Sequence, residues 1–571
     1  MSISRKFQRS KSKYTLSQKI ISAVTAAGFI MQPVVGFAQA IIRQDGTVLN
    51  SVNGVTDIWA EKVINDNVAI NRFQQFQLDA GKIANMYFNE QNRNGADVGN
   101  LVNFVNDRID INGTVNAIQN SQIGGNLFFL SKEGMAVGKS GVINTGSLYV
   151  MTPALTDGDF NATYAGLEGI FNSGQEANVN TSLERMKALN IPLNASGTIS
   201  VLGTINATGD VKMAAPKIAV GKNVSGTDLN DGENGAVGTK VNDVVKTASI
   251  KTGITDFSNF VNLTKKQQQE AGITSLTAEV SGNGDIVLAA KAEYGNSFDQ
   301  NFSNIGAMVG VPTPTTADTI EATVENYGTI TARGDAVLTA EVTNGNKDWA
   351  EEMLATNTPT GVNNPDYVPV PAADASNNIQ TVASVNVHGD VTAGGDIELS
   401  ASADNTYVDN GKGIIDSFKN STLDLATPMG ANVMILSNKA EVTVGQKADI
   451  KAEGVIDVYA NAVLDGTAGE AVNGRKLISK VPAAIPSASV VYTHTENEAS
   501  VTIEGNLTAN GKNITVKDEN GNDDKVIPAV NVSAYAEENL SSNAALNLKS
   551  GMFGAQSGLA AAVNILSLIH I

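Results

Sequence analysis

The sequence predicts an all-β protein, a right-handed parallel β-helix (solenoid) with an N-terminal capping region and loop or short-helix excursions. Short runs alternate aliphatic with polar residues and end at Gly or Asn, as in residues 197–201 and 203–207. Two distant runs, 438–445 and 497–505, align almost letter for letter, which indicates a repeat of about sixty residues. Only 5% of the residues are aromatic and 54 are Gly, which suits the narrow core of a solenoid better than several globular cores.

The first forty residues predict a targeting segment. A basic start, with Arg5, Lys6 and further Lys and Arg up to Lys19, precedes a short apolar run over 20–30. Ala38-Gln39-Ala40 then supplies a small-x-small cleavage site, so we expect a bacterial secretory signal cleaved after Ala40. The apolar run is shorter than the roughly 20 residues that span a bilayer, which favours no stable membrane span after cleavage.

Composition agrees with export and argues against nucleic acid as a partner. The chain has 58 Asp and Glu against 39 Lys and Arg, a formal net charge of -19, and no basic patch with interleaved aromatics. Cysteine is absent, so the stability of an exported chain would come from packing and not from disulfides.

Residues 71–153 hold the densest pattern of short strands and turns. An Asn-x-Phe-x-x-Phe element occupies 71–76, Asn-Phe-Val occupies 103–105, and Ile-Asn-Gly occupies 111–113. A strongly apolar run over 127–130 leads through a polar turn into Gly134-Met135.

These elements resemble the N-terminal secretion domain of the two-partner-secretion exoproteins, the family of filamentous haemagglutinin. Within that family they are most similar to the leukotoxin-type filamentous adhesins. The chain departs from the family at 131–133, where Ser-Lys-Glu stands in place of Asn-Pro-Asn. The positions expected to shape the recognised domain are Asn71, Phe73, Phe76, Asn103, Gly113, Leu130, Gly134, Met135 and Gly138.

The resemblance implies an organisation and a function. Residues 41–255 would form the secretion domain, with a capping strand and short sheet near its start, and 256–565 a β-helical repeat region. The chain would be exported through an outer-membrane β-barrel transporter whose periplasmic domains recognise the secretion domain. It would then act, secreted or at the cell surface, as an adhesin or leukotoxin that binds a receptor on host or bacterial surfaces.

The repeat region shows the same strand signature at 284–288, 328–335 and 389–397, with Asp285, Asp335 and Asp396 at equivalent corners. Between the signatures we expect short surface helices over 258–272 and 349–354, and loop excursions over 411–429 and 466–486. The last six residues, 566–571, match one reading frame of a common sequencing adapter, and we expect them to be an artefact at the end of a fragment.

No catalytic, cofactor or metal site is predicted. Gly138-Lys139-Ser140 suggests a phosphate loop, but the required first glycine is replaced by Glu133. The acidic turn over 518–524 lacks the sixth-position glycine and distal glutamate of a calcium loop. The three histidines have no ligand spacing.

Three other interpretations remain open. One is a classical autotransporter, which would require a C-terminal barrel beyond this sequence. The chain could be the stalk of a contact-dependent toxin whose catalytic C-terminus lies beyond this sequence. It could also be a β-helical glycan-active enzyme, which would need a cluster of carboxylates on one face. The recurrence of Asp285, Asp335 and Asp396 at equivalent corners favours turn chemistry over a unique enzymatic site.

Overall fold

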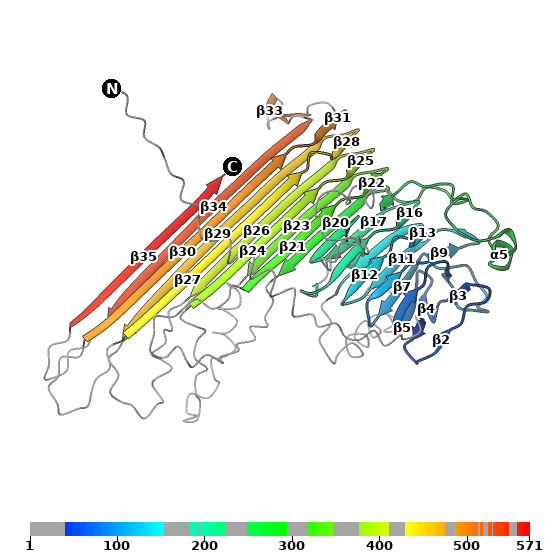
Figure 1. The fold of residues 1–571 in the computed structure, drawn as a ribbon, viewed down its shortest axis with the longest axis horizontal. Helices are drawn as coiled ribbons and strands as arrows, with labels where there is room; N and C mark the ends of the chain where they lie inside the picture. The colour runs from blue at the N-terminus through cyan, green and yellow to red at the C-terminus, as the bar shows by residue number, and fades with distance from the viewer. Residues whose placement is uncertain are drawn as a thin grey trace, which may run out of the picture. The chain divides into compact units, whose positions relative to one another are not determined.

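The computed structural model places almost every strand parallel to its equivalent in the next coil, and this pairing organises the chain (Figure 1). The described residues are 40–153, 183–190, 193–222, 248–293, 318–345, 376–409, 429–473, 486–511, 514–517, 523–527, 529–547 and 557–570. Buried and more exposed side chains alternate along strands of the later coils, such as residues 329–332 and 390–393, as the sequence pattern predicts. Strands of the first coils, such as residues 100–105, are buried on both sides. The prediction of a parallel β-helix is confirmed.

Strand β5 (Val68–Leu78) begins the helix and explains its cross-section. Its first half pairs with β7 and its second half with β8, so the 22-stranded sheet folds along β5 into two faces. The 11-stranded sheet supplies a third face. One coil therefore contains a strand from each face in turn.

The first face is continued by β7 (Asn100–Val105), β11 (Asn126–Leu130), β14 (Ser147–Met151), β17 (Val211–Ala215), β20 (Ile286–Glu293), β23 (Ala336–Gly345), β26 (Ile397–Asp409), β29 (Ile456–Asn473) and β34 (Val530–Asn547). The second face is continued by β8 (Ile109–Ile111), β12 (Gly134–Val137), β15 (Thr198–Val201), β18 (Lys217–Val220), β21 (Asp318–Asn326), β24 (Ser376–Val387), β27 (Met429–Val444), β30 (Pro486–Ile503) and β35 (Ser557–His570). Strand β35 includes the suspected adapter residues 566–570, which pair with β30.

The third face consists of β3 (Val55–Trp59), β6 (Ile83–Tyr87), β9 (Thr114–Gln119), β13 (Val142–Thr145), β16 (Thr204–Ala207), β19 (Ser249–Lys251), β22 (Thr329–Ala332), β25 (Asp390–Ala393), β28 (Asp449–Ala452) and β31 (Asn506–Ala509). A short strand, β10 (Gln122–Ile123), pairs antiparallel with β9. A separate hairpin joins β32 (Ile514–Lys517) to β33 (Asp523–Ile527). Parallel pairing continues from β16 through β19 to β22, so the boundary expected at residue 255 stays a prediction.

The expected cap covers the start of the helix. Strands β1 (Ile41–Arg43) and β4 (Lys62–Asn65) pair antiparallel with β5, and β2 (Val48–Leu49) pairs with β1. A cap of this kind prevents the edge of β5 from pairing with another chain. The capping region expected near residue 41 is confirmed.

Strands of the first two faces lengthen towards the C-terminus. Strand β8 has 3 residues, whereas β27 has 16 and β29 and β30 each have 18. Within each face, the long strands of successive coils lie side by side, coloured yellow to red in Figure 1. The excursions expected over 411–429 and 466–486 are therefore wrong for residues 466–473, which extend β29, and for residues 429 and 486, which begin β27 and β30. Residues 474–485 lie outside the described residues. Residues 466–468 pair with both β26 and β34, and 469–473 pair with β34, which outweighs the low strand propensity of the Gly and Ala residues there.

Buried polar side chains connect the two layers of long strands. Asn438 of β27 donates from Nδ2 to the carbonyl oxygens of Ala403 and Val463, at 3.1 and 2.9 Å. It also donates to Oδ1 of Asn497, its register partner on β30, at 3.0 Å. The near-identical runs 438–445 and 497–505 thus occupy equivalent positions in successive coils, as their alignment predicts.

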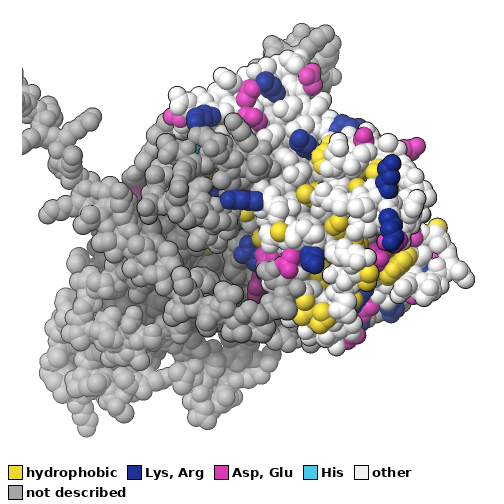
Figure 2. Space-filling view, turned by 45° about the vertical axis from the view of Figure 1, so that its right-hand side comes forward, with side chains coloured by type: hydrophobic (Ala, Val, Ile, Leu, Met, Phe, Trp, Pro, Cys, Tyr) yellow, Lys and Arg dark blue, Asp and Glu magenta, His cyan; other side chains and the backbone are white. Residues whose placement is uncertain are grey.

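The expected surface helix over 258–272 is present as α5 (Lys265–Glu270). Thr264 caps it, and the Thr264 and Gln267 side chains form a reciprocal capping box. The helix expected over 349–354 and the excursion over 411–428 lie outside the described residues. Charged side chains of both signs are interspersed on the face shown in Figure 2, with small apolar patches between them.

Candidate functional site

The residues expected to shape the secretion domain gather on the first coils. Asn71, Phe73 and Phe76 lie on β5, Asn103 on β7, Leu130 on β11, and Gly134 and Met135 on β12. Gly113 follows β8 and Gly138 follows β12, so both lie at corners that lead to the third face. The sequence pattern therefore picks out neighbouring positions in the folded chain.

The two predicted asparagines form a continuous chain of hydrogen bonds. Asn71 and Asn103 are register partners on β5 and β7, and both side chains are fully buried. Asn71 Nδ2 donates to Asn103 Oδ1 at 2.9 Å, and Asn103 Nδ2 donates to the carbonyl oxygen of Phe128 at 2.9 Å. Leaving a buried polar group without a partner costs about 1–3 kcal/mol, so each amide holds the orientation of the amide it bonds to.

Arg43 of the cap completes this network. Its Nη1 donates to Asn71 Oδ1 at 2.8 Å and its Nη2 donates to the carbonyl oxygen of Trp59 at 2.7 Å. The backbone N–H of Glu61 donates to the same Asn71 oxygen at 2.9 Å. Burial lowers the pKa of Arg43, while the carboxylates of Glu61 and Asp45 oppose this shift. A cap residue that the sequence did not single out thus links the cap to the predicted motif.

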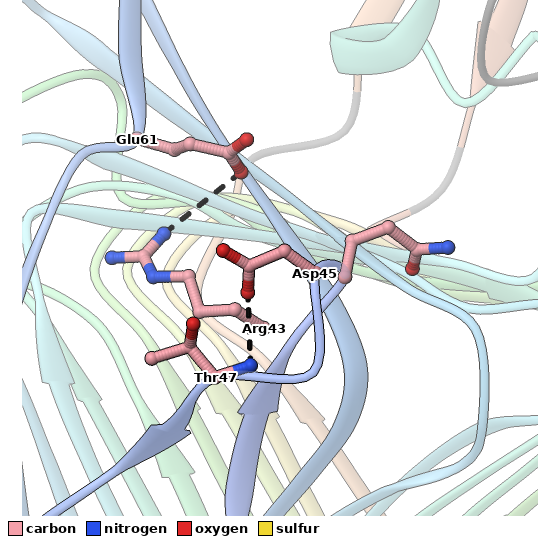
Figure 3. A pocket seen from close by; sticks show the side chains of 5 residues that line it. Arg43, Asp45, Thr47 and Glu61 are labelled. Carbon is pink, nitrogen blue, oxygen red and sulfur yellow. Dashed lines mark hydrogen bonds and ion pairs between the residues drawn. The ribbon is translucent and has the colours of Figure 1, made fainter.

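A small cavity of about 270 Å³ opens beside Arg43 (Figure 3). The Arg43 guanidinium lies 4.0 Å from the Glu61 carboxylate, and Asp45 accepts the backbone N–H of Thr47 at 2.9 Å. Glu61 also makes a close ion pair with Arg72. These charged groups are paired with one another, so the cavity is part of the cap's structure.

The predicted aromatics form the core of the first coils. Phe73 and Phe76 are fully buried and meet edge to face, with ring centroids 5.3 Å apart. Phe76 makes a second edge-to-face contact with Phe129 at 5.4 Å, and the Arg43 guanidinium lies over the Phe73 ring at 5.4 Å. Such pairs add about 0.5–1.5 kcal/mol each beyond the area they bury.

The three predicted glycines lie where a side chain would collide with a neighbouring coil. Gly134 has a φ of +100°, and an added Cβ would overlap the backbone carbonyl of Thr198. At Gly113 the obstruction is the carbonyl oxygens of Asp79 and Lys82. At Gly138 it is the Asn112 side chain. The family-like Gly pattern therefore has a steric cause in this chain.

Leu130 and Met135 are both buried but belong to different clusters. Met135 is part of the main core inside the helix. Leu130 faces outward from the first face, where Leu183, Met186 and Leu189 of a helical turn cover it. Phe128 in the same outer cluster stacks on Tyr149 with centroids 4.4 Å apart.

A second ladder of asparagines runs along the outside of the third face. Each amide donates to the side-chain oxygen of the residue one coil earlier, at 2.9–3.2 Å. The members in order are Asp57, Asn85, Asn116, Asn144 and Asn206. Sequence reasoning missed this ladder, although the recurrence of Asn two residues after Thr114, Val142 and Thr204 was a usable signal.

The recurring corner aspartates form a third column. Asp285 Oδ1 accepts the backbone N–H of Asp335 at 2.9 Å, and Asp335 Oδ1 accepts that of Asp396 at 2.8 Å. Asp396 Oδ1 accepts the N–H of Val455 at 2.8 Å. These carboxylates close one turn onto the next, as their equivalent positions predict. Among the side chains that the structure describes, no group of three His, Cys, Asp or Glu could hold a metal ion.

Other predicted positions contribute less. Ala38 and most of the acidic turn 518–524 lie outside the described residues. Ala40 is the first described residue, and its carbonyl oxygen accepts the backbone N–H of Gln77 at 3.3 Å. Ser140 donates to the carbonyl oxygen of Asn112 at 2.7 Å, which makes it part of a corner.

Comparisons with known proteins give no further identification. No family model, no curated protein and no solved structure matches this chain. Within the described ranges no helix has the length and apolar character required to cross a membrane.

Proposed function

We propose that this chain is an exoprotein of the two-partner-secretion type, exported through the periplasm to the cell surface or the medium. In this proposal an outer-membrane β-barrel transporter recognises the N-terminal coils. The observation that supports it is the connected network of Arg43, Asn71 and Asn103 beneath the cap. The residues that carry the sequence resemblance are packed against this network or lie one coil away.

The fold offers a physical route for such export. Each described coil pairs with the coil before it, so an unfolded chain can add coils one at a time once the first has formed. The cap pairs with β5 at the start of the first two faces, which favours growth towards the C-terminus. A chain without cysteine forms no disulfide that would obstruct passage in an extended state.

The finer part of the proposal is that the repeat region binds surfaces of host or bacterial cells, as an adhesin or leukotoxin-type protein. What supports this is the architecture of stacked coils, which presents an extended surface to a partner. The resemblance in the first coils is the only feature that favours this activity over others.

The double substitution Asn71→Ala with Asn103→Ala tests the proposal. Both side chains lie in the proposed recognition domain, so we expect secretion to fall several-fold in cells that co-express a cognate two-partner transporter. The measurement is the fraction of the chain in the medium against the periplasm. Normal secretion of the double variant would contradict the proposal.

A matched control is available in the later coils. Asn438 and Asn497 form the same kind of buried amide pair at 3.0 Å, far from the first coils. The variant Asn438→Ala with Asn497→Ala removes a comparable interaction and should leave secretion near the wild-type level. An equal loss in both double variants would show that general destabilisation, and not recognition, limits export.

A further inference from the structure

A segment that comes later in the chain crosses the outer side of the third face. This segment, residues 254–278, is here called the strap. It lies between β19 and β20 in sequence and includes α5. In Figure 1 it is the green segment beside the blue and cyan coils of the N-terminal end. Hydrogen bonds join it to four successive strands of this face, β6, β9, β13 and β16.

Apolar packing fixes the inner side of the strap. Phe257 and Val261 are at most 1% exposed, and they share one cluster with Tyr87 of β6 and Ile118 of β9. Three further strap residues belong to the same cluster: Leu263, Ala271 and Ile273. The strap is therefore part of the hydrophobic structure of the N-terminal coils and not a solvated excursion.

A turn in the strap directs two carbonyl oxygens at the asparagine ladder of the third face. The backbone N–H groups of Phe260 and Val261 donate to the carbonyl oxygen of Phe257, at 2.9 and 3.2 Å. The carbonyl oxygen of Phe260 accepts a hydrogen bond from Asn144 Nδ2 at 2.9 Å. That of Val261 accepts one from Asn116 Nδ2 at 3.1 Å.

The strap completes the hydrogen bonding of both ladder amides. Each amide nitrogen carries two N–H donors. Asn116 uses Nδ2 for Asn85 in the coil before and for the strap. Asn144 likewise uses Nδ2 for Asn116 and for the strap. Neither Asn116 nor Asn144 is exposed, so the strap takes the place that water would have at the second donor.

The strap bypasses the connections between neighbouring coils. In a solenoid each coil contacts only the coils beside it, so a coil at the end has one neighbour and is prone to fray. The hydrogen bonds of the strap instead span 116 residues to Asn144, 145 to Asn116 and 184 to Tyr87. One continuous segment thus connects the coils from β6 to β16.

We propose that the strap is a latch that joins the coils from β6 to β16 into one cooperative unit and protects the N-terminal end from fraying. The latch closes only when residues up to 278 have joined the fold, so these coils are held less firmly until then. This inference goes beyond the proposed function and does not depend on how the chain is exported.

Hydrogen–deuterium exchange with mass spectrometry on the full-length chain tests the latch. Val261→Asp places a carboxylate in the apolar cluster beneath the strap. Lys266→Asp is the matched control, because it places the same group on α5 where the Lys266 side chain is 81% exposed. Val261→Ala is a milder variant that weakens the same packing without adding a charge, and it serves if the charged variant does not fold.

We expect Val261→Asp to speed exchange in the strap and in β6, β9, β13 and β16 together, each at least about tenfold, because an unpaired carboxylate is strongly unfavourable among apolar side chains. Strands β25 and β28 should keep wild-type rates, as should every strand in Lys266→Asp. Val261→Ala should give the same pattern with smaller factors.

Two results would overturn the inference. One is faster exchange confined to the strap and the flanking strands β19 and β20, which would make the strap a passive excursion. The other is an equal increase in β25 and β28, which would mean that the strap does not define a separate unit. Secretion is measured in a different experiment, so either result leaves the proposed function standing.

Discussion

Gly134 shows how a single residue limits the spacing of two coils. Its φ of +100° is unfavourable for any side chain, and an added Cβ would meet the Thr198 carbonyl on the adjacent strand. We expect Gly134→Ala to lower the unfolding free energy of this region by about 1–3 kcal/mol. Urea unfolding followed by circular dichroism measures the shift.

Gly81 provides the control for this prediction. It also has positive φ, +74°, but an added Cβ would meet nothing within 4 Å. Gly81→Ala should therefore cost only the backbone strain, about 1 kcal/mol. Equal shifts for the two variants would show that contact with Thr198 contributes nothing.

His388 makes stability depend on pH. Burial lowers its pKa below the usual 6.5; Lys222 adds to the shift, while Glu325 and Glu504 oppose it. The unfolded chain therefore takes up a proton at His388 before the folded chain does. Stability from this group is present above pH 6.5 and is lost as the pH falls from 6.5 towards the lower folded pKa.

The variant His388→Phe isolates this effect. Phenylalanine keeps an aromatic ring beside Tyr327, on which His388 stacks at 4.7 Å, but it does not titrate. Between pH 7.5 and 5.5 the urea midpoint of the wild type should fall further than that of the variant. Parallel falls would assign the pH dependence to other groups.

At the scale of elements, the corner column of aspartates joins successive coils. Asp335→Ala removes the acceptor for the Asp396 N–H, and we expect a loss of about 0.5–1.5 kcal/mol. Asp335→Asn retains a side-chain oxygen in that position and should change stability by a few tenths of a kcal/mol at most. Unfolding midpoints of both variants test this, and an equal loss would assign the effect to charge and not to the hydrogen bond.

Sequence reasoning succeeded for strands that have a similar sequence in the adjacent coil. The runs 438–445 and 497–505 share a pattern because they fill equivalent positions in adjacent coils, so local alternation was enough to predict their strands. The segment 254–278, which packs on the outer side of the third face, could not be placed in the same way. Only its short helix has a local signal, the capping box of Thr264 and Gln267, whereas its docking depends on contacts more than a hundred residues away.

The sequence predicted several residues of the candidate site, but not the hydrogen bonds that connect them. Asn71 and Asn103 were named from a motif, but the sequence did not reveal that Arg43 bonds to the first of them. Arg43 directly follows the apolar residues Ile41 and Ile42, and no repeated pattern of charged residues around it indicates a role. Pairing of the cap with β5 creates that role in three dimensions.

At the scale of the whole molecule, coils bound mainly to their neighbours should unfold locally. In a solenoid the stability is close to a sum of coil and interface terms. Val442 of β27 and Ile143 of β13 are both fully buried in the same continuous core, many coils apart. A carboxylate at either position should therefore disrupt its own surroundings and spare the distant end.

Hydrogen–deuterium exchange with mass spectrometry can separate the two cases. Val442→Asp should speed exchange in β27 and in β24 and β30, the strands that pair with it. Exchange in β9 and β13 should stay at wild-type rates, because these two strands pair with each other and not with β24, β27 or β30. Ile143→Asp should do the reverse. Faster exchange along the whole chain in either variant would mean that the coils unfold as one cooperative unit, which would also argue against export by stepwise addition of coils.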